Sequence, residues 1–198
     1  MRLLLIADEE SKFLWDFFQP ELIGPVDLIL SAGDLKSSYL EFLVTMLHAP
    51  LVYVHGNHDA RLMDDPPGGC TCADNTVVTE KGLRIAGLGG CMGFNPQDPL
   101  QFSERQMAGQ VRRLDWQIKR TKGIDILLTH SPAKGMGDGE DVFHQGFACF
   151  LPLIEKRQPR LHVFGHQHKR YGLQQSQETL ATGRTQHLNP CGYQLFEW

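Results

Sequence analysis

The sequence predicts an α/β protein built around a mostly parallel β-sheet. Short apolar runs alternate along the chain with longer segments of helical periodicity, which is the pattern of βαβ units. Several of these runs stop abruptly at carboxylate or imidazole side chains, so functional groups are expected where the strands end. With 198 residues the chain is long enough for one domain with its own core, and 1–198 are expected to form a single domain.

The first half of the chain predicts three strands separated by helices. Apolar runs predict strands at 3–7, 27–34 and 51–59, the last ending in a turn. The intervening segments 12–18 and 37–48 have helical character, with apolar residues at helical spacing in the second.

The second half changes character. The segment 76–90 predicts a β-hairpin that turns at Lys81-Gly82, which indicates local antiparallel pairing. A long amphipathic helix is expected over 103–120, with Ser103 as its N-cap. The remaining expected elements are strands at 125–132 and 161–168 and, from about 178 to 198, antiparallel strands around Gly183 and Gly192.

Composition and charge argue against a nucleic-acid or membrane partner. The net charge of −4 gives no electrostatic reason to expect a nucleic acid or a membrane. The basic pairs Arg112-Arg113 and Lys119-Arg120 fall within a helical pattern and are expected to form a solvated helix face. The apolar run at the N-terminus is too short for a signal peptide or a membrane span, so a cytoplasmic protein is expected.

The cysteines favour a reducing compartment. Five is an odd number, which suits the cytosol better than a disulfide framework. Cys70 and Cys72 could bind a soft metal, but a second pair of the CxxC type is absent from the sequence. A loop with two free thiols is therefore favoured over a metal site.

Polar side chains with metal-binding atoms follow the ends of five predicted strands. In an open α/β sheet, ligands bind beyond the carboxyl ends of the strands, so these residues are expected to converge on one edge. Each residue alone has an ordinary explanation, such as a place in a turn or on the surface. The presence of such residues at five strand ends favours a metal-binding site. The residues are Asp8 with Glu10, Asp34, Asn57 with His58, His130, and His166 with His168.

These segments resemble the calcineurin-like metallophosphoesterases, in the right order and over nearly the whole chain. The family pattern is Asp-x-His, Gly-Asp, Gly-Asn-His-(Asp/Glu), a His after an apolar strand, and Gly-His-x-His. The matching residues here are Asp8-Glu9-Glu10, Gly33-Asp34, Gly56-Asn57-His58-Asp59, His130 and Gly165-His166-Gln167-His168. The resemblance implies a four-layer αββα sandwich of two mixed β-sheets with helices outside and a metal centre at one edge.

The resemblance also implies a reaction and a role for each residue. It implies hydrolysis of a phosphate ester by a bridging hydroxide activated between two divalent ions, which neutralise the attacking and leaving oxygens. The mixed donor set favours Mn²⁺, with Fe, Zn²⁺ or Mg²⁺ as alternatives. His58 would donate a hydrogen bond or proton to the leaving oxygen. Asp34 would bridge the two ions. The other ligands of the first ion would be Asp8, position 10 and His168, and those of the second would be Asn57, His130 and His166.

Position 10 departs from the family pattern, because Glu10 stands where a histidine is expected. On an extended chain, Asp8 and Glu10 lie on one face and Glu9 on the other, so Glu10 is expected to reach the metal. The added carboxylate would harden the first site toward Mn²⁺ or Mg²⁺. The alternative is that Glu10 misses the ion and leaves the first site weak or empty.

Two further features narrow the substrate. The residues after Gly33-Asp34 lack the Asp-Arg-Gly that protein phosphatases of the superfamily carry, so a small phosphate ester is favoured over a phosphoprotein. The glycine-rich loop 133–147 resembles the loop that faces substrate in the phosphodiesterase-like branch. There His144 matches its His-x-Gly, and Asp138 or Asp141 could also approach. A solvated loop without a role is the alternative.

The sequence therefore predicts a metal-dependent phosphoesterase that acts on a phosphodiester or a small phosphomonoester. The rivals are a catalytically inactive interaction module of the same fold and a nuclease, against which the acidic net charge counts. The oligomeric state is left open by the sequence, a homodimer included.

Overall fold

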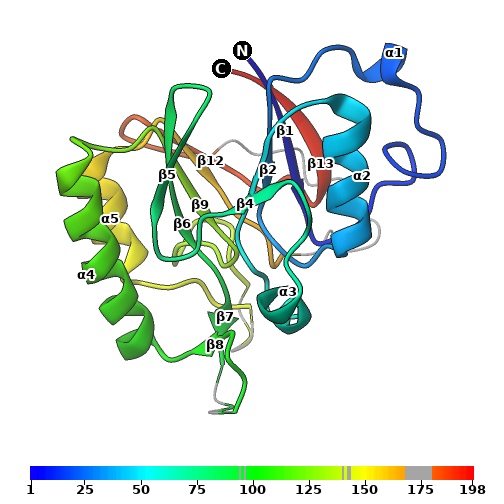
Figure 1. Ribbon diagram of the computed structural model, residues 1–198. Coiled ribbons are helices and arrows are strands. Elements are labelled where there is room, and N and C mark those ends of the chain that lie inside the picture. The colour runs from blue at the N-terminus through cyan, green and yellow to red at the C-terminus, as the bar shows by residue number, and fades with distance from the viewer. Residues whose placement is uncertain (94, 96, 140, 142–143, 168–179) are drawn as a thin grey trace.

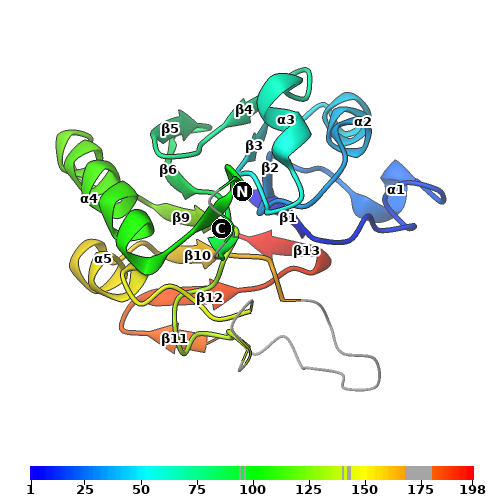
Figure 2. The same ribbon diagram turned by 90° about the horizontal axis from the view of Figure 1, so that it is seen from below.

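The computed structural model of the protein describes residues 1–93, 95, 97–139, 141, 144–167 and 180–198. Two mixed β-sheets pack face to face, and helices cover their outer faces (Figures 1 and 2). This is the four-layer αββα arrangement that the sequence predicts, so the expected fold class is confirmed.

The first sheet has five strands in the order β13-β1-β2-β3-β4. β1, β2, β3 and β4 run parallel to one another, and β13 pairs antiparallel with β1 at the edge. The strands are β1 (Arg2–Ala7), β2 (Leu28–Ser31), β3 (Leu51–Tyr53), β4 (Cys70–Cys72) and β13 (Gly192–Glu197).

The second sheet has six strands in the order β11-β12-β10-β9-β6-β5. Its four inner strands are parallel, and an antiparallel strand closes each edge. A two-stranded sheet, β7 (Cys91–Met92) and β8 (Gln101–Phe102), follows β6. The six strands are β5 (Val77–Glu80), β6 (Leu83–Leu88), β9 (Ile126–Thr129), β10 (Leu161–Val163), β11 (Leu180–Thr182) and β12 (Thr185–Leu188).

Three apolar clusters hold the layers together. One lies between the sheets, where the inward faces of β1, β2, β6 and β9 meet. The second packs α4 and α5 on the outer face of the second sheet, and the third packs α2 on the outer face of the first (Figure 1). The helices are α1 (Pro20–Ile23), α2 (Ser37–Leu47), α3 (Ala60–Asp64), α4 (Glu104–Arg120) and α5 (Phe150–Arg157).

Most of the predicted elements are present, but the structure differs from the expectations in several places. The hairpin turns at Lys81-Gly82, and Ser103 caps α4 through a reciprocal capping box with Gln106. The segment 12–18 forms turns instead of a helix, because its aromatic side chains pack on α2 and Pro20 holds the preceding residue extended. The helix α5 was not predicted.

The strands of the C-terminal segment, expected to be antiparallel, are so only in part. β11 and β12 form the expected hairpin around Gly183, but β12 then pairs parallel with β10. β13 crosses to the other sheet and pairs with β1. The backbone N–H of Trp198 donates to the carbonyl of Met1 at 2.8 Å, so the chain ends lie together, at the opposite end of the sheets from α3, β7 and β8 (Figure 1).

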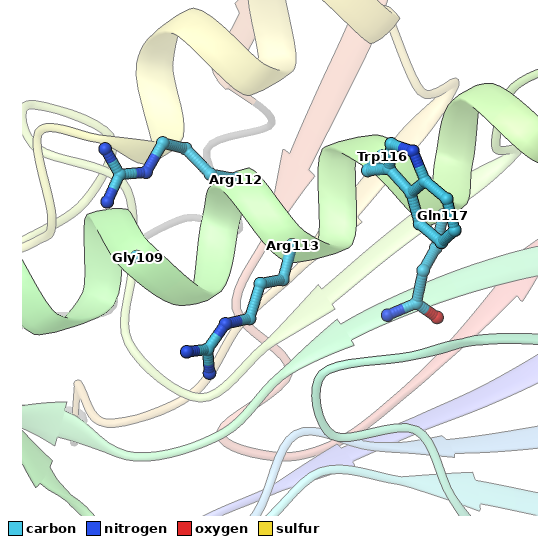
Figure 3. A pocket seen from close by; sticks show the side chains of 5 residues that line it. All are labelled: Gly109, Arg112, Arg113, Trp116 and Gln117. Atoms are coloured by element: carbon cyan, nitrogen blue, oxygen red, sulfur yellow. The ribbon is translucent and has the colours of Figure 1, made fainter.

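The basic helix face that the sequence predicts is confirmed on α4. Arg112 and Arg113 are exposed and line a shallow pocket of about 560 Å³ beside the exposed Trp116 (Figure 3). Arg120 lies over the Trp116 ring at 4.6 Å from its centroid. Within the described residues, no helix is both long and apolar enough to cross a bilayer.

Candidate metal centre

Four predicted ligands, which follow the ends of β2, β3, β9 and β10, lie together. The imidazole of His130 is fully buried, and its Nε2 lies 2.9 Å from Asn57 Oδ1 and 3.2 Å from His166 Nδ1. The same Nε2 lies 3.5 Å from Asp34 Oδ2. The ligand atoms of Asp34, His130 and His166 all lie within 4.8 Å of one another. The structure therefore brings these four residues together as a group that could hold a divalent ion.

The tautomer of His130 identifies the atom that faces this cluster. Its Nδ1 lies 2.8 Å from the carbonyl oxygen of Ala32, which can only accept, so Nδ1 carries the proton. In the neutral ring, Nε2 then presents a lone pair toward the Asn57 and Asp34 oxygens, which also present lone pairs. Metal-binding histidines are commonly fixed by such a hydrogen bond to a carbonyl. A mixed N/O donor set of this kind suits a divalent transition metal.

Asp8 approaches the same cluster from the end of β1. Its Oδ1 accepts a hydrogen bond from the backbone N–H of His166 at 2.8 Å. Its Oδ2 is buried and has no hydrogen-bond partner among the described residues. Burial raises the pKa of Asp8 to about 7, and the nearby Asp34 charge adds to the shift. A buried carboxylate oxygen left without a partner is costly, and a cation would satisfy it, so the donor set fits a metal.

Three of these residues have a strained backbone. Asp8, Asp34 and His166 have φ angles of 63°, 58° and 67°, in the left-handed region that residues with a side chain seldom adopt. Each such residue costs roughly 1–3 kcal/mol, and strain of this kind clusters at functional sites. In each case a strand ends at a sharp bend, which turns the side chain toward the others.

Two glycines allow the chain ends to approach. A Cβ on Gly56 would lie 2.1 Å from Asp34 Oδ1, and one on Gly33 would lie 2.4 Å from the Gly56 nitrogen. Any larger residue at either position would therefore displace the Asp34 carboxylate or the loop that carries Asn57.

Asp59 is a positioning residue to which the sequence reasoning assigned no role. Its Oδ2 accepts hydrogen bonds from the backbone N–H groups of Asp34 at 2.7 Å and Gly56 at 2.8 Å. Burial raises the pKa of Asp59 to about 6, although both hydrogen bonds favour the charged form. Its place directly after Asn57-His58 was the available signal.

His58 lies at the edge of the cluster. Its backbone N–H donates to Asp34 Oδ1 at 2.8 Å, which fixes the residue beside the cluster. Its side chain is exposed, unlike those of His130 and His166. The backbone of His58 is thus held beside the cluster while its imidazole is open to solvent.

Glu10 does not lie where an extended chain from Asp8 would place it. β1 ends at Ala7 and Asp8 is left-handed, so the extended chain assumed for 8–10 was wrong. The Glu10 carboxylate accepts from Lys36 Nζ at 2.9 Å and from the Lys36 backbone N–H at 3.4 Å. Ligation by Glu10 stays a prediction, and it requires the carboxylate to be shared with, or released by, Lys36.

If the centre holds two ions, as the resemblance implies, we expect Glu10→Ala to lower the number of bound ions toward one and to reduce turnover, because one ion alone cannot neutralise both the attacking and the leaving oxygen. Glu9→Ala is the matched control, since the Glu9 side chain is exposed. Restoring the family histidine with Glu10→His should shift the preferred metal away from Mn²⁺ while activity is kept. Elemental analysis and activity assays with each metal test this. Identical metal content and rate in Glu10→Ala and Glu9→Ala would remove Glu10 from the ligand set.

His144 is brought next to the cluster by its loop. Its ring centroid lies 5.3 Å from that of His166, and its Nδ1 lies 2.7 Å from Asp141 Oδ2. Asp138 is used within the loop, where its carboxylate accepts from the backbone N–H groups of Gly135 and Gly146. His168, the remaining predicted ligand, lies outside the described residues.

Comparisons with known proteins agree with this geometry. The family model of the calcineurin-like phosphoesterases matches residues 7–170. Metallophosphoesterase domain-containing protein 1 of Homo sapiens is 33% identical over 125 residues, which are 61% of this chain and 34% of that protein. UPF0046 protein T07D4.2 of Caenorhabditis elegans is 39% identical over 215 residues, covering 88% of this chain and 52% of that protein.

Solved structures share the fold. The crystal structure of TT1561 of Thermus thermophilus superimposes with a TM-score of 0.65 at 18% identity, covering 96% of this chain and 88% of that one. The chain spans between about a third and a half of the length of the two relatives above. The family model matches most of the chain, and divalent-metal binding is a property of that family. The chain belongs to the calcineurin-like phosphoesterase family.

Proposed function

We propose that the protein is a metal-dependent phosphoesterase that hydrolyses a phosphodiester or a small phosphomonoester. The observation that carries the proposal is the convergence of Asn57, His166 and Asp34 on Nε2 of His130. Packing alone gives no reason to bring these lone pairs together in a buried site. Membership of a phosphoesterase family supports the same conclusion.

The donor groups divide between two ions that share Asp34. One ion would be held by Asp34, Asn57, His130 and His166. The other would be held by Asp8 and Asp34, with positions 10 and 168 as its remaining ligands. Two divalent ions, with Mn²⁺ favoured by the oxygen-rich first site, would neutralise charge on the phosphate and activate a water. The glycines at 33 and 56 and the carboxylate of Asp59 keep the Asp34 and Asn57 side chains in place for this task.

His58 and His144 would act on the substrate. His58 is exposed at the edge of the cluster, where its imidazole can give a proton to the leaving oxygen of the ester. His144 lies beside His166 and is oriented by Asp141, so its imidazole can contact a phosphate oxygen or the alcohol group.

We expect His144→Ala to change the ratio of diester to monoester hydrolysis and to leave the metal content unchanged, because His144 lies beside the cluster without being in it. Kinetics on one chromogenic diester and one chromogenic monoester measure the ratio. Lys134→Ala, an exposed substitution in the same loop, is the control. An equal loss on both substrates, or no change on either, would remove His144 from substrate recognition.

Removal and return of the metal tests the proposed function. Protein treated with a chelator should not hydrolyse a chromogenic mono- or diester, and added Mn²⁺ should restore turnover of at least one of them. Bound metal without turnover on any ester would favour the interaction module. Preferential turnover of single- or double-stranded DNA would favour the nuclease.

A further inference from the structure

A second group of metal-binding side chains lies outside the centre just described. His55 Nδ1 lies 2.7 Å from Asp74 Oδ2 and 3.8 Å from Cys72 Sγ. One ligand atom from each of the three residues falls within a 4.8 Å group. The His55 side chain is buried, and those of Cys72 and Asp74 are half-buried. Asp34, the shared residue of the first centre, is not part of this group.

The group stands where the two sheets join. Cys72 ends β4 in the first sheet, and Asp74 forms a parallel bridge with Gly87 of β6 in the second. The backbone N–H of His55 donates to Asp74 Oδ1 at 3.3 Å, and the carbonyl of His55 accepts from Gly90 N–H at 2.8 Å. The three side chains thus come from segments that the backbone already holds in register.

The Asp74 carboxylate occupies a space that the chain keeps open. A Cβ on Gly89 would lie 2.6 Å from Asp74 Oδ2 and 2.7 Å from Asp74 Oδ1. Any side chain at position 89 would push the carboxylate away from His55. The backbone of both sheets therefore fixes the position of the Asp74 carboxylate, which is not free to rotate as a surface side chain is.

The arrangement excludes a Cys-His-Asp proton relay. A relay needs the thiol on one imidazole nitrogen and the carboxylate on the other. Here both Cys72 and Asp74 approach the same nitrogen, Nδ1 of His55. A hydrogen bond from Nδ1 to Asp74 accounts for the carboxylate, and the thiol, which also bonds with the Tyr53 side chain, lies beside the same nitrogen. Three different donor atoms around one point form a group that could hold a metal ion.

We propose that His55 Nδ1, Cys72 Sγ and Asp74 Oδ2 bind a Zn²⁺ ion at a site separate from the phosphoesterase centre, with a water in the fourth position. Zinc takes nitrogen, thiolate and carboxylate ligands at about 2.0–2.3 Å in tetrahedral geometry. Such bonds separate the donors by roughly 3.3–3.7 Å. Binding therefore requires the His55 and Asp74 side chains to move apart by roughly half an ångström, while Cys72 is already at a suitable distance. Binding releases two protons to solvent, the thiol proton of Cys72 and the Nδ1 proton that His55 donates to Asp74, and it leaves a neutral ring with its proton on Nε2.

The ion would connect β4 and the bridge between Asp74 and Gly87 to the segment that carries Asn57. His55 precedes Gly56-Asn57 directly, so the ion would stabilise the loop without contacting substrate. The proposed zinc site takes no part in hydrolysis. The zinc site and the proposed function are independent of each other.

Cobalt spectroscopy of the full chain tests the proposal, because Co²⁺ bound to a thiolate has a near-ultraviolet charge-transfer band that a nitrogen and oxygen site lacks. Wild type loaded with Co²⁺ should show the band, and Cys72→Ser should lose it together with one equivalent of bound Zn²⁺. Cys70→Ser is the matched control on the same strand, since Cys70 Sγ donates instead to the Gly68 carbonyl at 3.7 Å. It should keep the band.

Two further variants separate the sites and guard against misfolding. Asp34→Ala should keep the band, because Asp34 belongs only to the first centre. Asp74→Asn keeps the side-chain shape. It should weaken Co²⁺ binding, as measured by titration of the charge-transfer band, about tenfold or more. An unchanged band in Cys72→Ser, its loss in Cys70→Ser or Asp34→Ala, or no band in wild type would each overturn the proposal.

Discussion

Asp34→Ala is expected to lose both its bound metal and its activity. Asp34 approaches Nε2 of His130 through Oδ2 and accepts from the His58 N–H through Oδ1, so it links the candidate ligands to the loop that carries His58. It is also the one residue assigned to both ions. Metal affinity should fall by more than about 10²-fold, since the loss of groups that only support a ligand already costs 10–100-fold. Titration with Mn²⁺ followed by calorimetry measures the affinity.

Asp34→Asn is the matched variant for charge. The amide oxygen can still accept from His58 N–H, so the loop should keep its shape while the negative charge is lost. We expect weaker metal binding than in wild type but tighter than in Asp34→Ala. Wild-type affinity in both variants, with circular dichroism unchanged, would show that Asp34 is not a ligand.

His58→Ala is expected to keep its metal and lose most of its turnover. The side chain is exposed and the backbone N–H holds the contact with Asp34, so the ligand atoms are expected to stay in place. Loss of a proton donor typically lowers the rate by about 10²-fold or more. Elemental analysis and steady-state kinetics on the same preparation separate the two effects.

The control for His58 is an exposed histidine elsewhere. His48 ends α2 with a φ of 50°, so His48→Asn preserves the left-handed backbone that an alanine would strain. It should change neither metal content nor rate. If His58→Ala strips the metal as completely as Asp34→Ala does, His58 is a ligand and the assigned role is wrong.

The sequence was sufficient where the fold depends on local pattern. Strand ends at Asp8, Asp34 and His130 could be located because each apolar run stops at a polar residue, and the parallel sheets bring such ends to one edge. The capped helix α4 and the hairpin at Lys81-Gly82 follow from local signals in the same way.

Features that depend on distant contacts could not be predicted in this way. The pairing of Glu10 with Lys36 joins residues 26 positions apart and follows from the left-handed bend at Asp8. The segment 12–18 has a helical pattern, but aromatic packing on α2 decides its shape. The meeting of His55, Cys72 and Asp74 depends on how β3, β4 and β6 are placed side by side, so the thiols alone did not reveal it.

Anomalous diffraction from crystals of the protein grown with Mn²⁺ tests the central claim most directly. We expect a peak in the anomalous difference map between His130 Nε2, Asp34 Oδ2, Asn57 Oδ1 and His166 Nδ1, at about 2.0–2.3 Å from the coordinating atoms. A map without a peak at this position, in crystals where the four side chains keep the arrangement described above, would contradict the account.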